Sequence, residues 1–143
     1  MSDGEPRVNT VPDTDVAPAT VRAIVAGHGA FANGIISAVE QITGRGACFL
    51  GMSNTGLCLD DIQDTIARAL DDSGARVIFT DLPAGSCTMA VRRMIRERPG
   101  VLLVTGINLS TLLDFAMQDS ADPVAAVQAA LEKGRASMAV YGG

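Results

Sequence analysis

The sequence predicts an α/β fold built on a mostly parallel sheet, and two observations support this prediction. Short apolar segments typical of buried strands alternate along the chain with amphipathic segments typical of helices. The chain also has 143 residues, of which 48% are hydrophobic, so we expect one domain with a sizeable core. Aromatic residues make up only 3% and Trp is absent, so aliphatic side chains must fill this core.

Four apolar segments have the length of buried strands. These strands are expected at residues 21–27, 47–52, 75–81 and 100–106. A fifth segment, residues 135–141, alternates Ala136, Met138 and Val140 with Ser137, Ala139 and Tyr141. This alternation predicts a short last strand that is too weakly apolar to stand alone.

The segments between and after these strands have apolar residues at helical spacing. Helices are expected at residues 30–44, 57–74, 88–98, 109–118 and 122–134, the last opened by Asp122 and Pro123. The first helix is expected to bury Phe31, Ile35, Ala38 and Ile42, and the second Leu59, Ile62, Ile66 and Leu70. Three methionines are expected in the core, namely Met89, Met94 and Met117.

Strands that alternate with helices form a parallel sheet with right-handed crossovers and helices on both faces. Four or five strands fit the flavodoxin-like winding, whose strand order begins 2-1-3-4. In this order the first and third strands are neighbours, and ligands collect at their carboxyl ends. His28 follows the first strand and Asp81 ends the third. The topology therefore predicts that the only imidazole and a carboxylate share one crevice.

The first twenty residues differ from the rest in composition. They contain three prolines and few apolar residues, and their charged residues sum to −3 of the chain's net −5: Asp3, Glu5, Asp13, Asp15 and Arg7. We expect residues 1–20 to be a disordered acidic tail and residues 21–143 to form the domain. The negative charge argues against nucleic acid as a partner. No segment has the pattern of a signal peptide or the roughly 20 apolar residues of a membrane span, so a cytoplasmic protein is expected.

The cysteines indicate neither a disulfide framework nor a zinc site. Cys48, Cys58 and Cys87 are odd in number, form no C-x-x-C pair and have no cluster of ligands around them. We expect three reduced thiols, with Cys48 and Cys58 as packing residues. No metal is expected at any of them.

The glycine-rich segment around His28 is open to several chemical interpretations. Residues 27–32, GHGAFA, fit the relaxed G-x-G-x-x-G/A pattern of dinucleotide-binding proteins. However, Ser53 and Asn54 occupy the place where such proteins hold the ribose with an acidic residue, and no second domain is expected for a substrate. Alternatively, His28 has only a structural role, with its hydrogen bonds satisfied at the end of the strand, or it is chemically active.

Two kinds of active histidine remain possible. In the first, His28 is phosphorylated or acts as an acid–base group. Gly29 has no side chain to cover the backbone, and the N–H groups at the start of the following helix can then bind an anion beside His28. Asp81 can then hold one ring nitrogen and leave the other free as a nucleophile. In the second, Cys87 is the nucleophile of a thiol enzyme with His28 and Asp81, because a helix start lowers the pKa of a thiol.

A resemblance to a known family favours the phosphorylated histidine. GHGAFANGIISAVEQITG, FTDLPAGSC and VTGINLSTLLDFAM occur in that order and resemble the mannose-family IIA components, of mannose or N-acetylgalactosamine type, of the bacterial phosphoenolpyruvate-dependent sugar phosphotransferase system. The resemblance covers residues 21 to about 135. It implies that the chain is a phosphotransferase in which His28 takes a phosphoryl group from the carrier protein HPr and passes it to a IIB component.

The resemblance also implies roles for the residues near His28. Asp81 is implied as the hydrogen-bonding partner that orients His28, and Gly29 and Ser86 as contacts of the phosphate. No metal or other cofactor is needed for transfer between two nitrogens. The family's usual loop after the aspartate is Gly-Gly, then Thr or Ser, then Pro, whereas this chain has Ala84-Gly85-Ser86-Cys87 after Pro83. An acidic tail is not part of the family pattern.

Several consequences follow from the resemblance as expectations. The last strand is expected to be antiparallel and exchanged between two subunits of a homodimer, as in mannose-type members. Contact with the membrane is expected only through the IIC and IID components of a sugar transporter. The alternatives are a regulatory IIA-like phosphocarrier, for example one that serves a dihydroxyacetone kinase, and an interaction domain in which His28 is inert. Neighbouring genes for IIB, IIC and IID components would favour transport.

Overall fold

The sheet of this computed structural model, which describes residues 20–143, has the predicted topology. Four strands form it: β1 (Ala23–Gly27), β2 (Phe49–Ser53), β3 (Val77–Thr80) and β4 (Leu102–Thr105). All pairs are parallel and the order is β2-β1-β3-β4, as expected for the flavodoxin-like winding. The acidic tail predicted for residues 1–20 lies outside the described residues, apart from Thr20.

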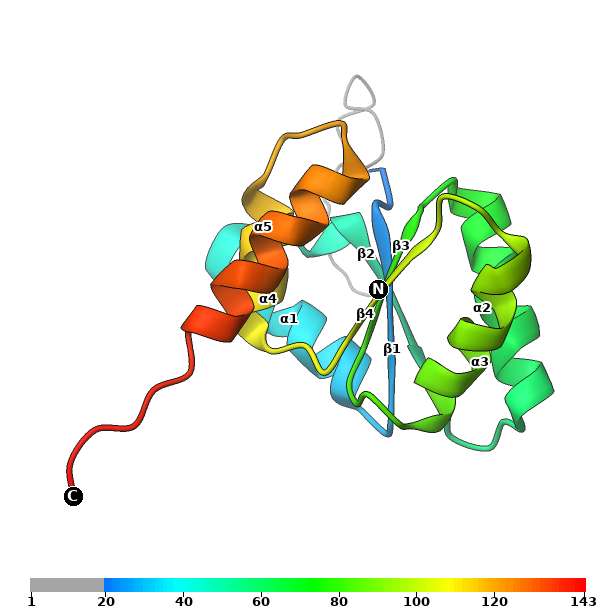
Figure 1. Ribbon diagram of the computed structural model, residues 1–143, viewed down its shortest axis with the longest axis horizontal. Helices are drawn as coiled ribbons and strands as arrows, with labels where there is room; N and C mark the ends of the chain where they lie inside the picture. The colour runs from blue at the N-terminus through cyan, green and yellow to red at the C-terminus, as the bar shows by residue number, and fades with distance from the viewer. Residues whose placement is uncertain (1–19) are drawn as a thin grey trace, which may run out of the picture.

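Helices cover both faces of the sheet (Figure 1). They are α1 (Phe31–Thr43), α2 (Leu59–Ser73), α3 (Ser86–Met94), α4 (Leu109–Met117) and α5 (Pro123–Ala136), with two 3₁₀ turns, η1 (Gly46–Cys48) and η2 (Ile95–Glu97). On one face lie α1, α4 and α5, and on the other α2 and α3. None of the helices in this part of the chain is long and apolar enough to cross a membrane.

The core consists of two layers because side chains alternate across each strand. Val25 and Phe79 point towards α1, α4 and α5, whereas Ile24 and Ile78 point towards α2 and α3. Phe79 also meets the ring of Phe115 on α4, with the ring centroids 5.1 Å apart in an edge-on arrangement. The four phenylalanines are thus concentrated in one layer.

Polar side chains cap two of the helices, and one of these caps, Asp122, was expected. Asp122 accepts a hydrogen bond from the Val124 N–H and places Pro123 at the first position of α5. Asn108 caps α4 and forms a capping box with Thr111. In α2, Ile62, Ile66 and Leu70 are buried as expected. These features fix where the helices begin and which face they bury.

Two expectations about the core hold only in part, because Phe31 and Ile35 pack against it but Ile42 does not. The buried residues of α1 are Ala32 and Val39, whereas Ile42 is 60% exposed, so the buried face is centred one residue away from the predicted one. In a helix with apolar residues on most sides, the sequence pattern alone does not fix this face. Met89 and Met117 are exposed on the outer sides of α3 and α4, and only Met94 is in the core.

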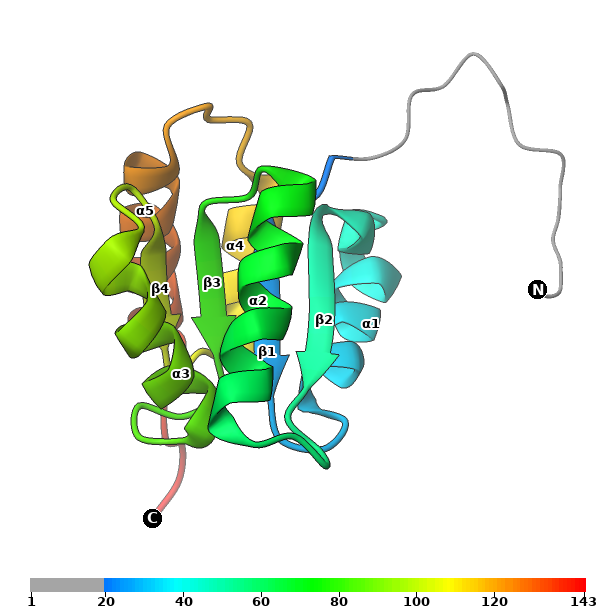
Figure 2. The same ribbon diagram turned by 90° about the vertical axis from the view of Figure 1, so that its right-hand side faces the viewer.

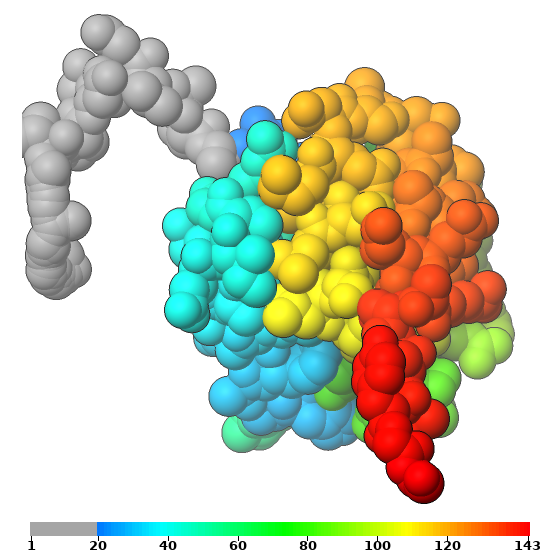
Figure 3. Space-filling view, turned by 90° about the vertical axis from the view of Figure 1, so that its left-hand side faces the viewer, coloured from blue at the N-terminus to red at the C-terminus, as the bar shows by residue number. Residues whose placement is uncertain are grey.

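The C-terminal segment also differs from the prediction. Residues 137–143 form no strand, and they run away from the body of the molecule beyond α5 (Figures 1 and 3). Met138, Val140 and Tyr141 are 80%, 91% and 92% exposed. A strand needs a neighbouring backbone to pair with, and no strand of the described chain lies against this segment. The apolar residues are therefore left in solvent.

Candidate active site

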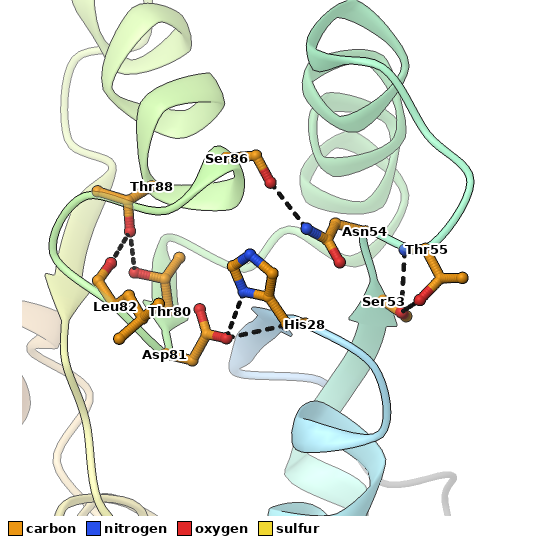
Figure 4. A network of polar contacts seen from close by, with 9 residues as sticks. All are labelled: His28, Ser53, Asn54, Thr55, Thr80, Asp81, Leu82, Ser86 and Thr88. Atoms are coloured by element: carbon orange, nitrogen blue, oxygen red, sulfur yellow. Dashed lines mark hydrogen bonds and ion pairs between the residues drawn. The ribbon is translucent and has the colours of Figure 1, made fainter.

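The loops that follow β1, β2 and β3 meet at the carboxyl edge of the sheet (Figure 2). His28 comes directly after β1, and Asp81 comes directly after β3. Because β1 and β3 are paired neighbours, these two residues leave adjacent positions of the sheet. Figure 4 shows the imidazole between the Asp81 carboxylate and the loop that carries Asn54.

His28 and Asp81 are held together by two hydrogen bonds to one oxygen. The ring nitrogen Nδ1 lies 2.8 Å from Asp81 Oδ2, and the His28 backbone N–H donates to the same oxygen at 2.9 Å. The Asp81 side chain is only 10% exposed, whereas that of His28 is 48% exposed. Burial opposes ionisation of Asp81, but the hydrogen bonds from His28 outweigh it and lower the pKa of this carboxyl. Asp81 is therefore an anion at neutral pH.

This arrangement determines which ring nitrogen is reactive. An ionised carboxylate only accepts hydrogen bonds, so Nδ1 of His28 has to carry the proton that lies between them. In the neutral ring the other nitrogen, Nε2, then has a free lone pair. Nε2 makes no hydrogen bond to any residue from 20 to 143. An exposed imidazole fixed in this tautomer can act as a nucleophile.

Two glycines allow this close packing. A Cβ atom at Gly27 would lie 2.8 Å from the Phe31 ring and 3.0 Å from Asp81 Oδ2. A Cβ atom at Gly85 would lie 2.9 Å from Cε1 of His28. Gly27 therefore makes room for the carboxylate, and Gly85 lets the start of α3 pack against the imidazole. Sequence reasoning did not identify Gly85 as a site residue.

Gly29 has a different reason to be glycine. Its φ of +53° lies in the left-handed region, which residues with a Cβ atom rarely adopt. A Cβ atom there would meet nothing within 4 Å, so the surface next to His28 is open. The His28 carbonyl accepts a hydrogen bond from the Phe31 N–H at 3.0 Å, so the turn leads directly into α1. Gly29 thus combines a tight turn with free access.

Ser86, the first residue of α3, has a partner that sequence reasoning missed. Asn54 Nδ2 donates a hydrogen bond to Ser86 Oγ at 2.8 Å, and the Asn54 backbone N–H donates to the Gly27 carbonyl at 3.0 Å. Because Ser86 Oγ accepts this bond, its own proton remains available to a ligand. Asn54 follows β2 at the same edge as His28, so the rule that located His28 could also have located Asn54.

Buried hydroxyl groups fix the loop that carries Asp81. Thr80 and Thr88 have their side-chain oxygens 2.6 Å apart, and the Thr88 hydroxyl also donates to the Leu82 carbonyl. Both threonines are at most 1% exposed. These bonds tie the end of β3 to the first turn of α3, so the Asp81 carboxylate and the start of α3 keep a fixed relation to each other.

The thiol hypothesis is wrong for this structure. Cys87 is fully buried in the layer between the sheet and α2–α3, and it takes no part in the site. Burial, together with the nearby charge of Asp81, raises the pKa of its thiol to about 11. A thiol with this pKa is protonated at neutral pH and is a poor nucleophile. Cys58, expected as a packing residue, is instead exposed, and Cys48 is half-buried.

Within residues 20–143, no group of His, Cys, Asp and Glu side chains could hold a metal ion. The groups that meet at the site are an exposed imidazole, a buried carboxylate, a serine hydroxyl and a helix start. The partial positive charge at the start of α3 can stabilise an anion beside the ring. This combination suits the transfer of an anionic group to and from Nε2.

Comparison with known proteins agrees with this chemistry. The family described as PTS system fructose IIA component, EIIA-man, matches residues 22–132. The chain belongs to this family. Its members are IIA components of sugar phosphotransferase systems and work with HPr and IIB components. No curated protein matches the chain significantly.

Solved structures of other IIA proteins show the same fold. The mannose/sorbose-specific IIA subunit from Enterococcus faecalis is 17% identical with a TM-score of 0.75, over 87% of this chain and 96% of that one. An EIIA component from Streptococcus agalactiae is 21% identical with a TM-score of 0.75, over 83% and 95%. The IIA protein associated with the fucose utilization operon of Streptococcus pneumoniae is 21% identical with a TM-score of 0.72, over 87% and 96%.

Proposed function

We propose that this chain is a phosphoryl-transfer component of sugar uptake, in which His28 accepts a phosphoryl group from phospho-HPr and passes it to a IIB component in the cytoplasm. The observation that carries the proposal is an exposed imidazole whose Nδ1 is held by Asp81 while Nε2 is free. Membership of the family supports the same assignment.

The proposed step exchanges one phosphorus–nitrogen bond for another. The lone pair of His28 Nε2 attacks the phosphorus of the donor's phosphohistidine as the bond to the donor nitrogen breaks. The donor ring leaves with the electron pair of that bond. As Nε2 gains the phosphoryl group, the His28 ring becomes cationic, and Asp81 stabilises it through the Nδ1 proton. Transfer to the IIB histidine reverses these events, so no metal or other cofactor is needed.

Groups around the ring are suited to receive the phosphoryl oxygens. The Ser86 hydroxyl keeps its proton free because its oxygen accepts from Asn54. No side chain caps the start of α3 at Gly85, so the first N–H groups of this helix are available beside the imidazole. Gly29 leaves room on the other side. We assign Ser86 and Gly29 to phosphate contact, and Asn54 to positioning Ser86.

The surface beside His28 suits protein partners. Three exposed apolar side chains stand on the loops or first turns at this edge, namely Leu57, Leu82 and Met89, which are 37%, 51% and 53% exposed. Apolar surface of this kind contributes most of the binding energy at protein interfaces. HPr and the IIB component would each cover these residues while the two imidazoles meet.

We further propose a homodimer in which the C-terminal segments are exchanged. Met138, Val140 and Tyr141 are the most exposed large apolar side chains of residues 20–143. The edge of β4 pairs only with β3, so its other side has free backbone groups for a strand from a second copy. Multi-angle light scattering at micromolar concentration should give twice the chain mass, and Val140→Asp should weaken this dimer. Val124→Asp, at a 52% exposed position on α5, is the matched control.

The phosphorylation proposal is tested with labelled phosphoenolpyruvate, enzyme I and HPr. The wild-type protein should take up one phosphoryl group in an acid-labile, base-stable bond, and His28→Ala should take up none. Ser37→Ala, an exposed change on α1, should be labelled like wild type. Passage of the label to a IIB component supports transport. Labelling of His28→Ala at the wild-type level would overturn the proposal.

A further inference from the structure

A cavity lies at the edge of the sheet where the strands begin, which is opposite the edge that carries His28. It has a volume of about 870 Å³ and is lined by residues just before β1 and β3, around η1 and at the end of α4. We call it the basal pocket. Its wall includes Thr20, Arg22, Arg45, Cys48, Arg76 and Phe115.

The basal pocket carries positive charge in a chain that is negative overall. Three arginines and one aspartate, Asp119, are the charged residues of its wall, so its formal charge is +2, whereas the whole chain has −5. Asp119 pairs with Arg45 at 3.3 Å and is 89% exposed. Arg22 and Arg76 make no ion pair with another residue of the described part of the chain.

The arginines are held in place but keep donors free. Arg22 donates through one guanidinium nitrogen to the Phe115 carbonyl at 3.0 Å and lies 4.3 Å above the Phe115 ring. Arg45 donates through one nitrogen to the Ala116 carbonyl at 3.2 Å. Each guanidinium has five N–H donors. Both arginines therefore cap the end of α4 and can still bind an anion.

The acidic segment 1–19 is tethered at the rim of this pocket. It has a net charge of −3 and continues directly into Thr20, which lines the pocket. Asp15 and Asp13 are five and seven residues from Thr20. An extended chain spans up to about 3.5 Å per residue, so both carboxylates can reach the arginines. A short tether also gives the segment an effective concentration of the order of millimolar.

The composition of the segment matches the rest of the wall. Val11 and Val16 flank the two aspartates, and the pocket offers apolar surface from Phe115, Val77 and Pro123. A segment that lacks a core of its own can bind in this way because the partner surface supplies both the charge and the apolar area.

We propose that the basal pocket binds the acidic segment 1–19 of the same chain, with the carboxylates of Asp13 and Asp15 facing Arg22, Arg45 and Arg76. This contact is at the opposite edge from His28 and does not depend on phosphoryl transfer. It gives a role to the acidic segment, which lies outside the family match at residues 22–132.

The test uses the full chain in which Asp13→Asn and Asp15→Asn are combined. The control is a second double variant that combines Asp61→Asn and Asp64→Asn. It changes the net charge by the same amount, but at two exposed positions of α2. Amide NMR spectra should show shifts at Arg45 and Arg76 in the first double variant only, and added salt should shift the same wild-type signals. The steady-state NOE of residues 11–19 should fall in the first variant.

A chemical readout comes from two native cysteines. Cys48 lines the pocket and Cys58 is exposed near the start of α2, so Cys58 serves as an internal reference. Alkylation of Cys48 relative to Cys58 should rise about three- to fivefold when Asp13 and Asp15 are neutralised, since two exposed ion pairs are lost.

Three outcomes would overturn the proposal. The first is that both double variants give the wild-type spectra at Arg45 and Arg76 and the wild-type alkylation ratio. The second is that these amide signals change with protein concentration, which would indicate that a second copy occupies the pocket. The third is that the Arg45 and Arg76 amide signals respond to added inorganic phosphate but are unchanged when Asp13→Asn and Asp15→Asn are combined. This result would indicate that the pocket binds an external anion.

Discussion

Replacing Asp81 with asparagine separates the charge of this residue from its shape. The Asn side chain has nearly the same size, and its oxygen can still accept from the His28 N–H and from Nδ1. However, the amide is neutral, and its NH₂ group takes the place of Oδ1, which is buried without a hydrogen-bond partner. We expect Asp81→Asn to fold and to transfer phosphoryl groups more slowly.

The size of this effect follows from the two hydrogen bonds at Oδ2. A hydrogen bond to a charged group contributes about 1.5–3 kcal/mol and a neutral one about 0.5–1.5 kcal/mol. Only the bond from Nδ1 strengthens as the ring becomes cationic, so the transition state loses about 1–2 kcal/mol. That loss corresponds to a rate of transfer from phospho-HPr that is roughly 5- to 30-fold lower.

The assay is rapid-quench transfer of label from phospho-HPr, followed for wild type, Asp81→Asn and a control. Asp60→Asn is the matched control, because Asp60 is an exposed carboxylate paired with Arg93. It should transfer at the wild-type rate. If Asp81→Asn folds and also transfers at the wild-type rate, Asp81 has only a structural role at the end of β3, and the proposed mechanism is wrong.

The same substitution has a signature in the pH dependence of stability. The pKa of Asp81 is lowered in the folded protein, so the unfolded state binds its proton more tightly. The stabilisation from the ionised carboxylate is therefore complete above the unfolded pKa of about 3.9 and is lost as the pH falls through the lower folded pKa. Urea unfolding should show a wild-type advantage over Asp81→Asn that shrinks as the pH falls below about 4.

Three further substitutions test neighbouring parts of the site. Gly85→Ala should slow labelling by phospho-HPr while leaving the circular dichroism spectrum unchanged, because a Cβ atom 2.9 Å from His28 Cε1 displaces the ring; a wild-type labelling rate would contradict this packing. Asn54→Ala should slow transfer less than Ser86→Ala does, since Asn54 acts only through the Ser86 hydroxyl; the reverse order would refute that role. Cys87→Ser should keep transfer but lose about 1–3 kcal/mol of unfolding free energy in urea, because a hydroxyl replaces a buried thiol; abolished transfer in a folded variant would restore the thiol hypothesis.

The sequence was sufficient to predict the strand order and the pairing of His28 with Asp81. Both follow from one regularity, since strands that alternate with helices form a parallel sheet whose carboxyl ends meet at one edge. The position of His28 after the first strand and of Asp81 at the end of the third then determines their contact. The prediction needed no knowledge of side-chain conformations.

Other features depend on packing between distant segments and could not be predicted. The contact of Gly85 with His28 requires the exact path of the loop before α3, which buried threonines fix. Cys87 stands at the start of that helix, and packing against α2 rather than sequence position turns it into the core. The last residues have strand-like alternation, but no strand of residues 20–143 lies against them, so they form no strand themselves.

The most direct test of the central claim is NMR of the single imidazole in the phosphorylated protein. Because His28 is the only histidine, the ¹⁵N signals of a histidine-labelled sample are unambiguous. We expect phosphorylation by phospho-HPr to shift the Nε2 signal and to give it a coupling to ³¹P, while Nδ1 keeps its proton and its hydrogen bond to Asp81. A phosphoryl group on Nδ1, or none on the imidazole, would contradict it.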